Sequence, residues 1–222
     1  MEIRTTFHKK LQEIHTDVLF MGSMVEKAIL SSVKALKERD LKLAEQIIAD
    51  DKNINAKRFD TENKCIQLIV TQQPMASDLR VIMAVANVVT ELERIGDYAE
   101  GIARIVLMIG DEPPLKPLVT IPRMAEKMVD MLRRSLQAFI NHDAAAARQI
   151  ATEDNEVDQL YDELYRVLIT FMLEDPKTIT RATRLIWVSH NLERAADRVT
   201  NICERVVFTV TGKMEEIGAS RY

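Results

Sequence analysis

The sequence predicts an all-α protein made of two tandem antiparallel three-helix bundles related by an internal repeat. Apolar residues recur every three or four positions along most of the 222-residue chain, which is the spacing of amphipathic helices. Only six glycines and six prolines are present, too few for the many turns of an all-β fold. An acidic sequence also recurs one hundred positions later, which indicates an internal duplication.

The first bundle begins with two long helices. A stripe of apolar residues at 4-3-4-3 spacing predicts a first helix that ends near Arg39. Asp40 is a suitable N-cap for a second helix, which starts at Leu41 and runs to about Gln73, where Pro74 breaks it. The stripe of the first helix consists of Phe7, Leu11, Ile14, Val18, Met21, Val25 and Ala28.

The third helix has the most regular apolar pattern in the chain. Ser77 is its expected N-cap, with Asp78 in the first turn. Short turns between three helices of about 30 residues favour an antiparallel bundle over residues 1–109. The apolar stripe consists of Val81, Val85, Val88, Leu92, Ile95, Ala99, Ile102 and Val106.

A proline-rich stretch separates the two halves. Residues 110–121 form the expected linker, and a second three-helix bundle is expected over residues 122–222. Its helices are predicted at about 122–141, 143–173 and 177–210. The stripe of the last helix again has no polar interruption and consists of Leu185, Val188, Leu192, Ala195, Val199, Ile202 and Val206.

The two halves align residue by residue. The second helix of each half aligns at an offset of 103, which pairs Asp51 with Asp154 and Ile54 with Val157. The third helix of each half aligns at an offset of 100. We therefore expect two similar bundles packed side by side around a pseudo-twofold axis.

Acidic side chains recur at matched positions in both halves. Residues 91–97 contain Glu93 and Asp97, and residues 191–197 contain Glu193 and Asp197. Four residues of helix place both carboxylates of a pair on one face, about 6 Å apart along the axis. Two like charges at this spacing destabilise a helix unless something compensates them.

Further acids interrupt the apolar stripes. Asp51 and Asp154 each lie between core-facing residues, where a carboxylate is costly unless it is paired or bound to a cation. Asn55 and Asp158 follow one turn later and are additional candidate ligands. Such an oxygen-donor set suits Mg²⁺, Mn²⁺, Ca²⁺ or iron. Each half therefore offers a candidate metal site.

A purely structural alternative stays open at this point. The acids could form a solvated face that pairs with Arg94 and Arg194. His190, three residues before Glu193, could join a metal site, but a helical histidine at a core edge more often has a structural role. The sequence has no Glu-x-x-His pair of the di-iron bundle type and no HExxH, P-loop, GxGxxG or GxSxG motif. We therefore do not expect an enzyme.

Composition limits the cellular setting. The net charge of −4 gives no reason to expect a nucleic-acid partner. The N-terminal residues lack the apolar run of a signal peptide, and no stretch is long and apolar enough to span a membrane. Cys65 and Cys203 lie in helical patterns without a CxxC partner, which is typical of reduced cysteines. We expect a soluble cytoplasmic protein, with peripheral membrane docking left open.

The sequence resembles the PhoU family, the accessory regulators of bacterial high-affinity phosphate transport. The resemblance spans nearly the whole chain and is carried by the turn at residues 73–80, the doubled Leu-Glu-Arg-x-x-Asp block at 92–97 and 192–197, and residues 201–204. It implies two three-helix bundles that hold iron or zinc on acidic motifs. The corresponding positions here are Glu93, Asp97, Glu193, Asp197, Asp154 and Asp158.

One departure from the repeated pattern distinguishes the two sites. Asn55 stands in the first half where Asp158 stands in the second, which removes one charge. We therefore expect the site at Glu193 and Asp197 to bind metal more firmly than the site at Glu93, Asp97 and Asp51.

The resemblance also implies a function. Family members are negative regulators that link the phosphate ABC transporter ATPase to a membrane sensor histidine kinase and keep the phosphate-starvation response off when phosphate is plentiful. They are cytoplasmic homodimers, peripheral to the membrane. We expect iron, zinc, magnesium or manganese as the metal, and no organic cofactor. A metal-dependent hydrolase or oxidase, or a metal-storage bundle, is the alternative function.

Overall fold

The computed structural model describes residues 2–217, and their side chains from residue 6 onward. No strand is present among these residues, so the predicted all-α class is confirmed. The elements are α1 (Glu2–Glu38), α2 (Leu41–Gln72), α3 (Ser77–Ile109), α4 (Thr120–Asn141), α5 (Ala144–Thr152), α6 (Asp154–Glu174), the 3₁₀ turn η1 (Pro176–Thr178) and α7 (Ile179–Thr211).

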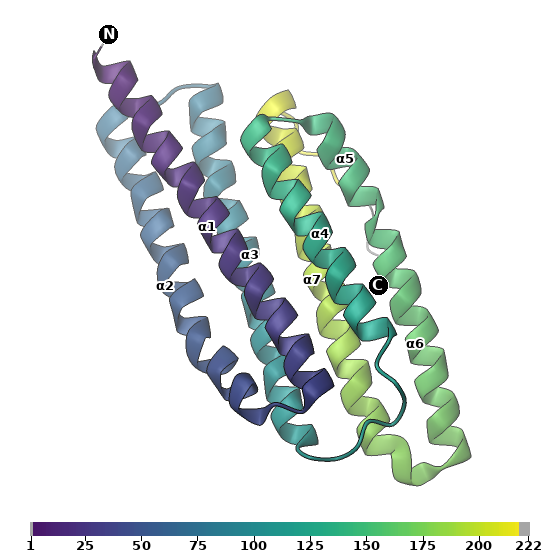
Figure 1. The fold of residues 1–222 in the computed structure, drawn as a ribbon. Helices are drawn as coiled ribbons and strands as arrows, with labels where there is room; N and C mark the ends of the chain where they lie inside the picture. Colours follow the sequence, from purple (N-terminus) through teal and green to yellow (C-terminus); the bar gives the residue numbers. More distant parts are fainter. Residues whose placement is uncertain (1, 218–222) are drawn as a thin grey trace.

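The helices form two bundles that lie side by side (Figure 1). α1, α2 and α3 make the first bundle, and α4, α5, α6 and α7 make the second. α3 packs against α7 more extensively than any other pair of helices, and α1 packs against α4. α2 and the α5–α6 pair lie on the two outer flanks. The apolar stripes of both halves join one continuous hydrophobic core, so the bundles are not independent units.

Contacts between α3 and α7 follow a pseudo-twofold axis. Glu91 Oε2 of α3 accepts hydrogen bonds from Asn201 Nδ2 of α7 at 3.2 Å and from Arg198 Nη1 at 3.4 Å. The symmetry-related positions, Gly101 and Asn191, also meet: a Cβ atom at Gly101 would lie 3.3 Å from Asn191 Nδ2. Because residues 91 and 201 meet while 101 and 191 meet, the two helices run antiparallel (Figure 1).

The repeat extends through the first helix of each half. Arg39 and His142, at the same offset of 103, both have positive φ angles, of 58° and 53°. Asp40 and Asp143 follow them, and their side chains accept hydrogen bonds from Leu43 N and Ala146 N, each at 2.9 Å. The predicted Asp40 cap is confirmed. One offset of 103 therefore relates α1 and α2 to α4, α5 and α6.

The predicted Ser77 cap is wrong. Ser77 is the first residue of α3, and Ala76, with φ 48°, occupies the N-cap position without a side-chain bond. The backbone closes this turn instead, since Asp78 N donates to Met75 O at 3.2 Å. A backbone turn can satisfy an N–H group that a serine would otherwise cap.

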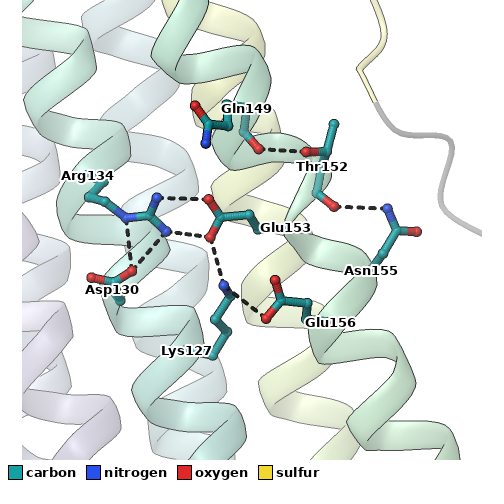
Figure 2. Close-up of polar contacts among 8 residues, drawn as sticks. All are labelled: Lys127, Asp130, Arg134, Gln149, Thr152, Glu153, Asn155 and Glu156. Atoms are coloured by element: carbon teal, nitrogen blue, oxygen red, sulfur yellow. Dashed lines mark hydrogen bonds and ion pairs between the residues drawn. The ribbon is translucent and has the colours of Figure 1, made fainter.

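A break divides the helix predicted over residues 143–173. α5 ends at Thr152 and α6 begins at Asp154, with Glu153 between them. Thr152 Oγ1 donates to Gln149 O, and Asn155 Nδ2 donates to Thr152 O, so side chains bind carbonyls near the junction (Figure 2). Arg134 and Lys127 of α4 donate hydrogen bonds to the carboxylate of Glu153.

The predicted domain boundaries, 1–109, 110–121 and 122–222, stay a prediction. In the structure α3 ends at Ile109 and α4 begins at Thr120, two residues before the predicted start. Both cysteines are buried and free, as expected. Within residues 2–217, none of the helices has the length and hydropathy that crossing a membrane requires.

The contact between the bundles can be tested at Glu91. Glu91→Ala removes the carboxylate that Arg198 and Asn201 share, and leaves a half-buried guanidinium without this acceptor. We expect the free energy of unfolding in urea to fall by about 2 kcal/mol. The control is Glu45→Ala, an exposed acid on α2, which should change stability by less than about 0.5 kcal/mol. Equal stability of the two variants would contradict the role of Glu91.

Candidate metal centre

Each half places its predicted acids between the third helix and its outer neighbour. We define the first acidic cluster as Asp51 of α2 with Glu93, Asp97 and Glu100 of α3. The second acidic cluster contains Asp154 and Asp158 of α6 with Glu193 and Asp197 of α7. The heptad stripes cause this placement, because each acid lies beside a core position on its helix. The structure therefore brings together the acids that the sequence predicted in each half.

Burial and mutual repulsion raise the pKa values of the first cluster. Burial raises the pKa of Asp51, and the charges of Glu100 and Glu93 add to the effect. Burial, then Glu93 and Asp51, raises the pKa of Asp97 to about 6. Oδ1 of Asp51 is buried without a hydrogen-bond partner. These carboxylates carry more negative charge than their surroundings stabilise.

Three protein groups partly compensate the first cluster, and one of them is Arg104, whose Nη2 donates to Glu100 Oε1 at 2.6 Å. Arg58 Nη1 donates to Glu93 Oε1 at 2.8 Å, and Arg58 Nε donates to Glu62 Oε1 at 2.9 Å. Asn55 Nδ2 donates to Asp51 Oδ2 at 2.8 Å. The sequence reasoning missed Arg58, although it lies seven residues after Asp51, a spacing that places both on one face of α2.

The second cluster is less well compensated. Burial raises the pKa of Asp154 to about 7, with contributions from Asp158, Asp197 and Glu193. Burial also raises the pKa of Glu193 to about 7, since its side chain is almost fully buried and faces Asp197 and Asp158. Asp154 Oδ1 and Glu193 Oε2 are both buried without a hydrogen-bond partner. The position of Arg58 is taken here by Tyr161, which carries no positive charge.

Cations near the second cluster lie at its edge. Arg194 Nη1 is 3.5 Å from Asp197 Oδ2, and Arg194 also bonds to Tyr98 of the other bundle. His190 Nδ1 is 3.5 Å from Glu193 Oε2, and burial, together with the charge of Arg194, lowers the His190 pKa. In the first half, Arg94 is 3.8 Å from Glu91. The arginine pairing that the alternative interpretation required is therefore only partly present.

Comparison with known proteins identifies the family. The model of the PhoU domain matches residues 18–106 and 121–206. The chain is 40% identical over 186 residues to a phosphate-specific transport system accessory protein PhoU homolog of Aquifex aeolicus, which covers 84% of each chain. It is 36% identical over 207 residues to the accessory protein PhoU of Escherichia coli, covering 93% of this chain and 86% of that protein. This chain belongs to the PhoU family.

A solved PhoU structure has the same fold. The crystal structure of PhoU from Pseudomonas aeruginosa superposes with a TM-score of 0.88 at 35% identity, over 93% of this chain and all of that chain. The two segments that match the PhoU domain contain the first and the second acidic cluster respectively. The predicted family and fold are therefore confirmed, whereas the metal ligands of this PhoU chain stay a prediction.

The donor chemistry of the acidic clusters fits a metal ion. Oxygen donors, excess negative charge and three buried, unpartnered carboxylate oxygens, on Asp51, Asp154 and Glu193, suit a hard or borderline cation. In residues 2–217, no three Asp, Glu, His or Cys side chains stand close enough together to hold an ion as they are oriented. Metal binding would therefore also require the carboxylates to turn toward one another.

The raised pKa values predict an unusual pH dependence of stability. Asp97, Asp154 and Glu193 have folded pKa values of about 6 to 7, above the unfolded values near 4. The folded state therefore binds more protons between pH 4 and 7, and stability falls as pH rises through this window. With a chelator present, we expect the free energy of unfolding to drop by at least roughly 2 kcal/mol from pH 5 to pH 8, less than the sum of the three separate shifts because they share the same mutual repulsion.

Asp154→Asn is the matched variant for this measurement. It removes one titrating group and should flatten the decline between pH 5 and pH 8, while Glu163→Gln, an exposed acid on α6, should not. Stability that rises with pH over this interval in the unmodified, chelated protein would overturn the assignment.

Metal content should differ between the two clusters. We expect Glu193→Ala/Asp197→Ala to lose most of the bound metal of purified protein, measured by elemental analysis, and Glu93→Ala/Asp97→Ala to lose less. Glu45→Ala/Glu163→Ala, with one exposed acid in each half, is the control and should retain all of it. Equal metal content in all three variants would refute the prediction.

A reciprocal exchange tests why the clusters differ. Asn55→Asp should increase the metal content of the first half, because it replaces the amide that donates to Asp51 with another carboxylate. Asp158→Asn should decrease the metal content of the second half. Unchanged metal content in both variants would show that this position does not set the preference.

Proposed function

We propose that this protein is a negative regulator of phosphate uptake and of the phosphate-starvation response. The main support is that both repeats match the PhoU domain. Relatives that are 36–40% identical to this chain are named as accessory proteins of the phosphate-specific transport system. Their similarity spans most of the chain. A role for this chain in regulating phosphate transport follows from this membership.

The finer proposal is an adaptor that links the phosphate ABC transporter ATPase to a sensor histidine kinase. The length of α2 and α6 and the exposed residues along them support it, because helical faces of this length can receive partner helices. We propose that the adaptor works in the cytoplasm as a homodimer that docks peripherally on the membrane. The relatives are named accessory proteins, which supports a regulatory partner of the transporter more than an independent enzyme.

Metal binding belongs to the same proposal. Asp154, Asp158, Glu193 and Asp197 would hold the ion in the second half, and Asp51, Glu93 and Asp97 in the first. A bound divalent or iron-type ion supplies positive charge that stabilises the ionised carboxylates. Its role is then to fix the spacing of α6 and α7 and the shape of the faces they present. A hydrolase or oxidase would need an open pocket beside the ion, and the cavity next to Asp51 is not lined by Glu93 or Asp97.

Deletion of the gene in its host tests the regulatory role. At high phosphate, we expect a phosphate-starvation reporter to rise from its repressed level toward the level of starved cells, because the negative regulator is absent. Reintroducing the unmodified gene should restore repression, and the Glu45→Ala/Glu163→Ala control should restore it equally. A reporter that stays repressed after deletion would contradict the proposal.

A further inference from the structure

A cavity of about 290 Å³ opens between α1 and α2 in the first bundle. Its wall is mostly apolar and includes Met24, Ile47 and Ile54. Asp50, whose side chain is exposed at the mouth, and Asp51, which is partly buried, also line it. The volume is near the lower end of small-molecule pockets, which are about 300–1,000 Å³. It therefore has room for one side chain or a ligand of similar size.

The internal repeat shows what occupies the equivalent space in the second bundle. The offset of 103 relates Met24 to Lys127, Ser31 to Arg134 and Asp50 to Glu153. Figure 2 shows that these three residues of the second bundle form one ion-pair network.

The network is centred on the Glu153 carboxylate. Arg134 binds it in a bidentate manner, with Nη1 at 2.8 Å from Oε1 and Nη2 at 2.5 Å from Oε2 (Figure 2). Lys127 Nζ lies 2.7 Å from Oε2 of the same carboxylate. These bonds hold the pKa of Glu153 at about 2. A guanidinium thus enters this space in the second bundle, and a cavity of about 240 Å³ remains beside Arg134, lined also by Gln149 and Ile150, the equivalents of Gln46 and Ile47.

The first bundle keeps the acid and lacks both cations. Met24 and Ser31 carry no charge, and among the described side chains none forms an ion pair or hydrogen bond with Asp50. Asp51 Oδ1, on the same wall, is also buried without a hydrogen-bond partner. The space that Arg134 uses in the second bundle is therefore open here, next to carboxylate oxygens without donors.

We propose that this cavity binds an alkylguanidinium group in the place that Arg134 holds in the second bundle. The guanidinium pairs with Asp50, and its methylene stem packs against Met24, Ile47 and Ile54. An arginine side chain of a partner protein and a free guanidinium compound share this chemistry. Lys27 lines the same cavity at the position of Asp130, which accepts from Arg134 in the second bundle. The positive charge of Lys27 therefore opposes binding and limits its affinity.

Nuclear magnetic resonance titration of the full-length protein tests the site. N-acetyl-arginine-amide represents a partner side chain, agmatine represents a free compound, and N-acetyl-citrulline-amide is the uncharged control of the same shape. We expect saturable shifts of backbone amides in α1 and α2 around the cavity for at least one guanidinium probe, and none for the citrulline probe. Tighter binding of the arginine amide assigns the site to a partner side chain, and tighter binding of agmatine assigns it to a free ligand.

Four variants locate the binding. Asp50→Asn should weaken binding at least tenfold, and Lys27→Asp, which copies Asp130, should strengthen it several-fold. Met24→Lys/Ser31→Arg copies the second bundle and should abolish binding while the melting temperature is kept or raised, which shows that the variant folds. Glu45→Gln, an exposed acid on α2, is the control and should bind as the unmodified protein does. Absence of saturable shifts at the cavity, or equal binding by the Asp50→Asn variant, would overturn the proposal.

Discussion

Burying several carboxylates of like charge between two helices requires something that neutralises them. A proton, an arginine or lysine, a hydrogen-bond donor or a metal ion can do so, and each is recognised by different contacts of the carboxylate oxygens. In this protein the pKa values of Asp51, Asp154 and Glu193 are raised, and each of these residues has a buried carboxylate oxygen without a hydrogen-bond donor. The α2–α3 and α6–α7 interfaces both contain this constraint, and the acids that impose it lie within the two segments that match the PhoU domain.

The two halves meet the same constraint with different residues. In the first half Arg58 pairs with Glu93 and Asn55 donates to Asp51, so protein groups supply part of the compensation. In the second half the uncharged Tyr161 and the acid Asp158 stand at those positions, and the charges of Arg194 and Arg198 offset only part of the repulsion that raises the pKa of Glu193. The difference is reversed at the preceding residue of each half, where Arg134 and Lys127 bind Glu153 while its equivalent, Asp50, lines a cavity without a cationic partner among the described side chains. The two halves therefore differ in which of their acidic positions is bound by cationic side chains of the protein.

Much of this architecture could be predicted from the sequence, because heptad stripes and turn residues act locally. Spacing alone predicted the buried stripe from Val81 to Val106 and the Asp40 cap. It also predicted that Asp51 and Asp154 occupy equivalent positions in the two halves. It did not predict the break at Glu153. Glu153 bonds to Arg134 and Lys127 of another helix, and spacing along one helix cannot reveal such contacts. The Ser77 cap was mispredicted because a backbone turn at Met75 took its place. Arg58 follows Asp51 at heptad spacing, so its place on the same face of α2 was predictable from the sequence.

The direct test of metal compensation is anomalous X-ray diffraction from crystals of the purified protein, measured on both sides of the absorption edge of the bound metal. We expect an anomalous peak between Asp154, Glu193 and Asp197, with carboxylate oxygens about 2.0–2.6 Å away and turned toward the ion, and a weaker peak or none at Asp51. A peak remote from both acidic clusters, or a second cluster whose carboxylates are satisfied by protein donors with no anomalous signal, would contradict it.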